Sequence, residues 1–171
     1  MTCPDYSGTS PFHLAIQESA STCLQVALQM LPREILSLPH PQFLLPLLHA
    51  VQMGNKEACQ MLVEAGADVN EVEEESGRGP LHFATELNHK DLVDYLIECG
   101  GVLDLIDGRG FTPLHVASIV EGAESLEAIV RRVGGGEVLD MRDSRELTPL
   151  MHSCLYGNAD SVRLLLKKKV S

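Results

Sequence analysis

The amino-acid sequence predicts an all-α solenoid of about five helix–turn–helix repeats, forming a single domain over residues 1–171. A short stretch similar to Thr-Pro-Leu-His-x-Ala starts at residues 10, 45, 79, 112 and 148, so successive copies lie 35, 34, 33 and 36 residues apart. Several copies are followed by a second segment with apolar residues at helical spacing. One such helix pair is too small to bury its own apolar face, so neighbouring pairs must stack into a continuous core.

The first helix of each repeat is predicted to begin at this recurring stretch. In the most regular copy, Thr112 can cap the free backbone N–H groups of the first turn. Pro113 suits the first helical position, because an N–H there would have no partner. Leu114 and Ala117 then share one face of the helix. The other copies begin at Ser10, Leu45, Gly79 and Thr148.

The second helix of a repeat follows a glycine that breaks the first. After Gly54, the apolar residues Ala58, Met61 and Leu62 recur at helical spacing. Gly66 can then adopt the left-handed conformation that ends many helices. The same pattern runs from Asp91 to Gly100 and from Ala159 to Lys167.

The T-P-L-H-x-A start, the mid-repeat glycine, the G-A-D-V-N ending and the period together resemble the ankyrin repeat, over roughly residues 8–169. The resemblance implies antiparallel helix pairs stacked side by side, with hairpin-like loops projecting at right angles. It places five repeats at about residues 8–41, 42–74, 75–107, 108–143 and 144–171.

Some segments depart from the regular pattern. Pro39 and Pro41 are incompatible with a helix, so the first inter-repeat loop is expected to be irregular. The fourth repeat is lengthened around residues 121–123 and 134–136. Glu146 stands where a glycine is normal, so the turn there is expected to be altered or strained.

Composition limits the class of protein. The formal charge of −11 repels phosphate backbones, so we expect no direct binding of nucleic acid. Five scattered cysteines without a C-x-x-C pair indicate a reducing compartment and small buried thiols. No leader or membrane-length apolar run is found, so we expect a monomer in the cytoplasm or nucleus, or both, with no membrane contact. The methionines are interpreted as core filler: Met30, Met53, Met61 and Met151.

The sequence predicts no enzyme, no cofactor and no metal site. His13, His82 and His115 recur at the fourth place of the T-P-L-H stretch, and the resemblance implies that this histidine ties the capping residue to a neighbouring loop. No H-E-x-x-H zinc spacing or calcium loop is present. The glycines at 134–136 are not followed by the Lys-Ser or Lys-Thr of a phosphate loop.

Recognition of another protein is therefore the predicted function. The resemblance implies that a partner contacts the loop tips and the inner faces of the first helices. Phe111, Leu147 and Tyr156 could anchor such a partner or could instead pack against adjacent loops. The glutamate-rich loop over residues 71–78 could receive a basic segment. The candidate contact residues are Glu73, Glu74, Glu75, Arg78, Glu86, Leu87, Arg109, Phe111, Ile119, Val120, Arg145, Leu147 and Tyr156.

Asn70 ends the Ala-Asp-Val-Asn stretch, eight residues after Leu62. In ankyrin-like proteins an asparagine at this place is a known type of target for a cytosolic asparaginyl hydroxylase, so the resemblance implies that Asn70 is a candidate for β-hydroxylation. The alternative is that its short amide only makes hydrogen bonds within the loops.

Three functions stay open. The favoured one is a non-catalytic protein–protein interaction module that binds its partner through a concave loop and helix surface. A narrower one follows from residues 70–93, which resemble a late repeat of the inhibitor-of-κB proteins. Such proteins bind Rel/NF-κB transcription factors and block DNA binding. A third is an adaptor or substrate-recruiting subunit of a larger complex such as a ubiquitin ligase.

Overall fold

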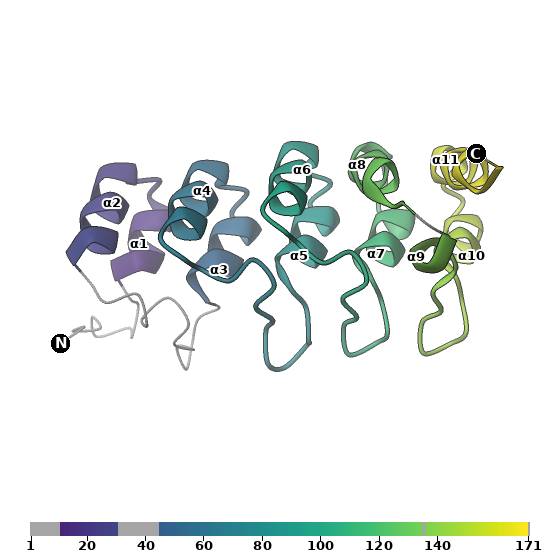
Figure 1. Ribbon diagram of the computed structural model, residues 1–171, viewed down its shortest axis with the longest axis horizontal. Helices are drawn as coiled ribbons and strands as arrows, with labels where there is room; N and C mark the ends of the chain where they lie inside the picture. Colours follow the sequence, from purple (N-terminus) through teal and green to yellow (C-terminus); the bar gives the residue numbers. More distant parts are fainter. Residues whose placement is uncertain (1–10, 31–44, 135, 171) are drawn as a thin grey trace.

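The computed structural model describes residues 11–30, 45–134 and 136–170, and within these ranges it contains eleven α-helices and no strand. Figure 1 shows two rows of helices stacked along the long axis, with loops that project from one side. The inner row consists of α1 (Pro11–Gln17), α3 (Pro46–Gln52), α5 (Pro80–Glu86), α7 (Pro113–Ile119) and α10 (Pro149–Leu155). The outer row consists of α2 (Ser21–Met30), α4 (Lys56–Glu64), α6 (Lys90–Glu98), α8 (Glu124–Arg132) and α11 (Ala159–Val170). The predicted all-α solenoid is confirmed.

A single apolar core runs the length of the stack. Leu24, Leu62, Leu96 and Leu114 are each at most 1% exposed and come from successive helix pairs. Burying one such side chain contributes about 2 kcal/mol. Because each pair shares its core with the next, the repeats hold one another in place.

The predicted helix starts are present in the structure. The Thr112 hydroxyl accepts from the His115 backbone N–H, and the Thr148 hydroxyl accepts from the Met151 backbone N–H, both at 3.4 Å. Pro113 occupies the first turn of α7. On the outer row, the Asn55 side chain caps α4 by accepting from the Ala58 N–H at 3.0 Å.

Left-handed backbone recurs at matching places in the described repeats. The mid-repeat position has φ of +65° at Gly54 and +50° at Asn88, which replaces the glycine. Before the inner helix, Glu146 has φ of +62°, where the preceding repeat has Gly110 at +78°. The turn at Glu146 therefore keeps its shape, and the residue carries the backbone strain that the sequence indicated.

Two expectations need comment. Met30, Met53 and Met151 are exposed, so their interpretation as core filler was wrong, and only Met61 packs against the core. Met30 and Met53 stand at helix ends, and Met151 is exposed in the first turn of α10. Pro39 and Pro41 lie outside the described residues.

The lengthened part of the fourth repeat contains a short helix that the pattern did not predict, α9 (Gly136–Asp140). Leu139 in α9 is buried, and Asp140 forms an ion pair with Lys169 of α11. The insertion thus packs against the fifth repeat instead of extending into solvent. None of the described helices has the length and apolar character needed to cross a membrane.

Candidate protein-interaction surface

The projecting loops of the fourth and fifth repeats are held by buried aspartates. One carboxylate oxygen of Asp107 accepts from the backbone N–H groups of Arg109 and Phe111, both at 2.8 Å. Asp143 does the same for Arg145 at 2.8 Å and Leu147 at 2.9 Å. Each aspartate therefore fixes a tight loop whose tip side chain points outward.

Adjacent loops are also joined to each other. The Gly108 N–H donates to the Ser76 carbonyl at 2.8 Å, and the Ser144 N–H donates to the Arg109 carbonyl at 3.1 Å. These backbone bonds hold the three loops in register along the stack. The side chains at their tips consequently form one surface rather than three independent ones.

The histidines of the T-P-L-H stretch support this surface from inside. The Nε2 of His82 donates to the Phe111 carbonyl at 2.9 Å, and that of His115 donates to the Leu147 carbonyl at 3.1 Å. Their Nδ1 atoms accept from the N–H of Gly79 and of Thr112, each at 3.2 Å. Burial lowers the pKa of both imidazoles, so each is a neutral group that ties its helix to the next loop.

His152 plays a different part, which the sequence did not reveal. Its Nε2 donates to the second carboxylate oxygen of Asp143 at 2.8 Å, and both side chains are fully buried. Burial would raise the pKa of Asp143, but hydrogen bonds from Leu147, His152 and Arg145 hold it at about 2. The Nδ1 of His152 is buried without a hydrogen-bond partner. The one-residue shift from T-P-L-H to T-P-L-M-H was the only signal in the sequence.

Four apolar residues stand at the C-terminal ends of the inner helices, each as the C-cap: Met53, Leu87, Val120 and Tyr156. We call these residues the apolar row. Met53 is 51% exposed, Leu87 48% and Tyr156 56%, whereas Val120 is half-buried. Next to the row, Leu155 is exposed and Ile119 is half-buried. Met53 and Leu155 occupy the places that match the candidate contacts Leu87 and Ile119 in other repeats.

The three candidate anchor residues differ in exposure. Phe111 is 6% exposed, and its ring stacks on His115 and meets His152 edge-on at 4.9 Å between centroids. It therefore supports the surface from beneath. Leu147 is half-buried. Tyr156 is exposed and stacks on His152 with centroids 6.2 Å apart, so its ring is the part of this cluster that reaches solvent.

The charged candidates also fall into two groups. Arg78 is only 14% exposed, because its guanidinium lies over the Phe83 ring and pairs with Glu86 at 2.8 Å. Glu74 and Glu75 are exposed at the tip of their loop, whereas Glu73 is half-buried and accepts from the Ser76 hydroxyl. Arg109 and Arg145 are 70% and 58% exposed. The exposed charges among these candidates are thus acidic on the loop before α5 and basic at the tips of the next two loops.

The amide of Asn70 bridges two loops. Its nitrogen donates to the Gly100 carbonyl at 3.1 Å, and its oxygen accepts from the Val102 N–H at 2.9 Å. Loop hydrogen bonding by Asn70 is therefore confirmed.

The other reactive side chains do not assemble into a site in the described part of the chain. No group of three or more His, Cys, Asp or Glu side chains is placed to hold a metal ion in these ranges. Burial raises the pKa of the Cys59 thiol to about 12, which keeps it protonated at neutral pH. Cys23 and Cys154 are exposed, so the expectation of buried thiols was wrong for these two.

Comparison with protein families gives the same architecture. A family model described as "Ankyrin repeats (3 copies)" matches residues 47–136, and one described as "Ankyrin repeat" matches residues 145–171. The chain belongs to the ankyrin-repeat family. Ankyrin repeats are protein–protein interaction modules and are generally non-catalytic.

For individual relatives, the similar region covers a larger share of this chain than of the relative's own length. The B-cell lymphoma 3 protein homolog of Mus musculus is 33% identical over 71% of this chain and 30% of its own length. The nuclear factor NF-kappa-B p105 subunit of Mus musculus is 35% identical over 76% and 14%. The 2-5A-dependent ribonuclease of Homo sapiens is 40% identical over 43% and 10%. The chain thus spans a third or less of the length of these relatives.

Proposed function

We propose that this ankyrin-repeat chain binds a partner protein across the apolar row and the adjoining loop tips, without catalysis, in the cytoplasm or nucleus. The supporting observation is the exposure of Met53, Leu87 and Tyr156 at the same place in separate repeats. A repeat solenoid can bury its apolar residues between repeats, so a row left in water favours a partner over core packing. Half-exposed side chains of this size could each contribute about 1 kcal/mol when covered.

Two contacts connect the row to the loops. Arg78 comes from the third-repeat loop and pairs with Glu86, which directly precedes Leu87. Tyr156 stacks on His152, which in turn binds the loop aspartate Asp143. A partner that covers the apolar row would therefore also meet the loop tips.

We further propose a narrower partner class, the Rel/NF-κB transcription factors. The similarity to the NF-kappa-B p105 subunit covers 76% of this chain, and the glutamate-rich loop at residues 71–78 resembles that of the inhibitor-of-κB proteins. An adaptor subunit would use the same surface and differ only in its partner. Similarity to a ribonuclease and a p105 subunit alike supports the interaction module more strongly than any one partner.

The test is a competition assay with a purified Rel dimer and a fluorescent κB DNA duplex. The chain should displace DNA from the dimer, and Tyr156→Ala combined with Leu87→Ala should weaken displacement about tenfold or more. Val26→Ala, which removes an exposed apolar side chain from α2, serves as the control and should change nothing. Undiminished DNA binding at saturating chain would exclude the Rel class, and equal effects of the two sets of variants would exclude the apolar row.

For Asn70 we propose β-hydroxylation by an asparaginyl hydroxylase. Asn70 is half-buried in a surface loop, and a hydroxyl on its Cβ would leave the two amide hydrogen bonds in place. Mass spectrometry of the chain produced in animal cells should show a peptide heavier by one oxygen, and Asn70→Gln should remove that species. Absence of the oxidised peptide when the enzyme is co-expressed would overturn this proposal.

A further inference from the structure

We propose that the partner segment lying along the apolar row has opposite charges at its two ends. Its basic end passes the third-repeat loop at Glu74 and Glu75, and its acidic end reaches Arg109 and Arg145 on the next two loops. The inference rests on the proposed function and adds the chemistry and the direction of the partner. It is carried by the order of charged side chains on successive loop tips, which follow the stack in the same direction as the exposed apolar residues.

The two arginines have donors available for an acidic group. In the described residues, the nearest carboxylates to Arg109 and Arg145 are Asp107 and Asp143, whose oxygens lie 3.7 and 3.6 Å from the arginine Nε atoms. These two contacts are ion pairs whose distances are too long for a hydrogen bond. Both aspartates are already occupied, because each accepts two backbone N–H groups. The outer nitrogens of both guanidinium groups therefore remain free to bind a carboxylate.

The two arginines act from one rigid platform. The Ser144 N–H donates to the carbonyl of Arg109, so the two loop tips are joined directly. The Arg109 guanidinium lies 5.2 Å from the centre of the Phe111 ring, which is itself packed on His115. Little side-chain ordering is then needed when an acidic group binds at Arg109.

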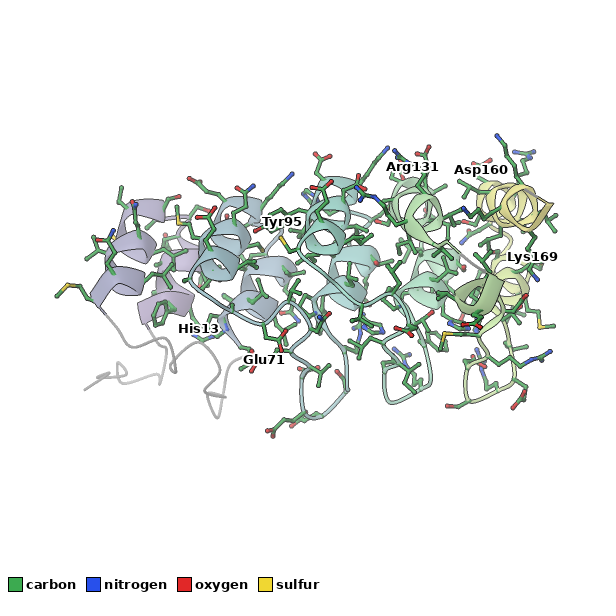
Figure 2. All side chains as sticks on the ribbon, viewed as in Figure 1. His13, Glu71, Tyr95, Arg131, Asp160 and Lys169 are labelled. Atoms are coloured by element: carbon green, nitrogen blue, oxygen red, sulfur yellow. The ribbon has the colours of Figure 1, made fainter. Side chains whose placement is uncertain are left out.

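The loop of the third repeat carries negative charge, opposite to that of the two arginines. The loop before α5 carries the acidic residues Asp68, Glu71, Glu74 and Glu75. Arg78 on the same loop is already paired with Glu86. Burial raises the pKa of Glu71, and the negative charge of the neighbouring Asp68 adds to this rise. Figure 2 shows Glu71 on the loop side of the stack, whereas Arg131 and Asp160 project from the opposite, outer-helix edge.

The order of charges matters because the chain as a whole is acidic. With a net charge of −11, nonspecific attraction alone would favour a partner that is basic throughout. The apolar row and the charged loop tips both run along the stack, so a segment with an apolar face, a basic end and an acidic end matches the glutamates of the third-repeat loop and the arginines of the next two loops. Charge complementarity of this kind fixes the register and direction of the bound segment.

The experiment uses three fluorescent amphipathic peptides with the same apolar middle and with Lys/Glu, Lys/Lys or Glu/Glu ends. Fluorescence anisotropy with the intact chain should give the tightest binding for the Lys/Glu peptide. Arg109→Glu combined with Arg145→Glu should weaken that peptide about three- to tenfold and should strengthen the Lys/Lys peptide. Arg131→Glu combined with Arg163→Glu makes the same change of net charge on the outer helices and serves as the matched control.

A nitroxide label reports the direction independently. Placed at the acidic end of the Lys/Glu peptide, it should broaden the amide signals of Arg109 and Arg145. Placed at the basic end, it should broaden those of Glu74 and Glu75. The same pattern from both labels would overturn the proposal, as would tighter binding of the Lys/Lys peptide to the unaltered chain. If Leu87→Ala combined with Tyr156→Ala leaves the binding of every peptide unchanged, the proposed function itself fails, whatever the charge variants do.

Discussion

The fourth and fifth repeats each use a buried histidine to hold a projecting loop, but the histidine stands at a different helical position in each. In the fourth repeat, His115 lies at the third helical residue and binds forward to the carbonyl of Leu147 in the next loop. In the fifth, Met151 takes that place and is exposed, while His152 binds back to Asp143 in the loop that leads into its own helix. One histidine therefore joins two repeats, and the other fixes a loop to the helix that follows it.

The two histidines therefore contribute to stability in different ways. A bond from a helix to the loop of the next repeat strengthens the stack, whereas a bond from a helix to the loop that leads into it holds one loop tip in place. The fifth loop also has to accommodate Glu146 in a left-handed conformation, where the fourth loop has Gly110. The buried Asp143–His152 pair thus stabilises the loop that has the less favourable backbone.

The largest effect is expected when Asp143 is replaced. Asp143→Ala leaves two backbone N–H groups and His152 Nε2 without their acceptor, which should cost about 3 kcal/mol. Asp107→Ala removes two backbone bonds but no histidine, so the loss should be smaller. Urea unfolding followed by circular dichroism measures both. Asp160→Ala, at an exposed ion pair on α11, is the control and should lie within about 0.5 kcal/mol of the unaltered chain. Equal losses for the two buried aspartates would contradict the comparison.

A double-mutant cycle sharpens the assignment of His152. Combining His152→Ala with Asp143→Asn should reveal a coupling energy of about 1–2 kcal/mol, because the two side chains are in direct contact in a buried site. The same cycle between His82→Ala and Asp143→Asn should give a value near zero, since His82 binds Phe111 of the fourth-repeat loop. Comparable coupling in both cycles would mean that the histidines act through the stack as a whole.

Acidification should weaken the repeat contacts before it weakens the fifth loop. Burial lowers the pKa of His82 and His115 below the ordinary value of 6.5, so the unfolded chain binds more protons. Stability should therefore rise with pH through the region below 6.5 and be fully present above it. His82→Gln should reduce this slope in urea unfolding between pH 5 and 7.5. The contribution of Asp143, with a pKa of about 2 against 3.8, should be lost only as the pH falls from about 4 to 2. A slope that His82→Gln leaves unchanged would refute the assignment.

The features predicted from sequence were those set by local backbone chemistry. The helix starts at Thr112 and Thr148 and the strain at Glu146 follow from residue type and position alone. The role of His152 could not be read in this way, because it depends on a carboxylate nine residues earlier that the fold turns back towards it.

Exposure was harder to predict than helix position. The sequence pattern places Met53 and Phe111 correctly relative to the inner helices. It does not predict which side chains pack around each of them. Phe111 is covered by histidines from two repeats, whereas Met53 remains in solvent. Which side chains a partner can reach is therefore decided by packing between repeats, and a repeat motif describes each repeat in isolation.

The smallest expected effect concerns the backbone of the fifth loop. Glu146→Gly relieves a left-handed residue but makes the unfolded chain more flexible, so the net gain should be about 0.5 kcal/mol. Glu146→Ala keeps the strain while removing the same exposed carboxylate, and it should give no gain. Gly110→Ala is the converse change: its Cβ would lie 2.8 Å from the Ser144 nitrogen, so stability should fall. Thermal unfolding can rank the three variants. If Glu146→Gly is no more stable than Glu146→Ala, the loop has relaxed around Glu146. The left-handed backbone then costs the fifth repeat little energy relative to the fourth.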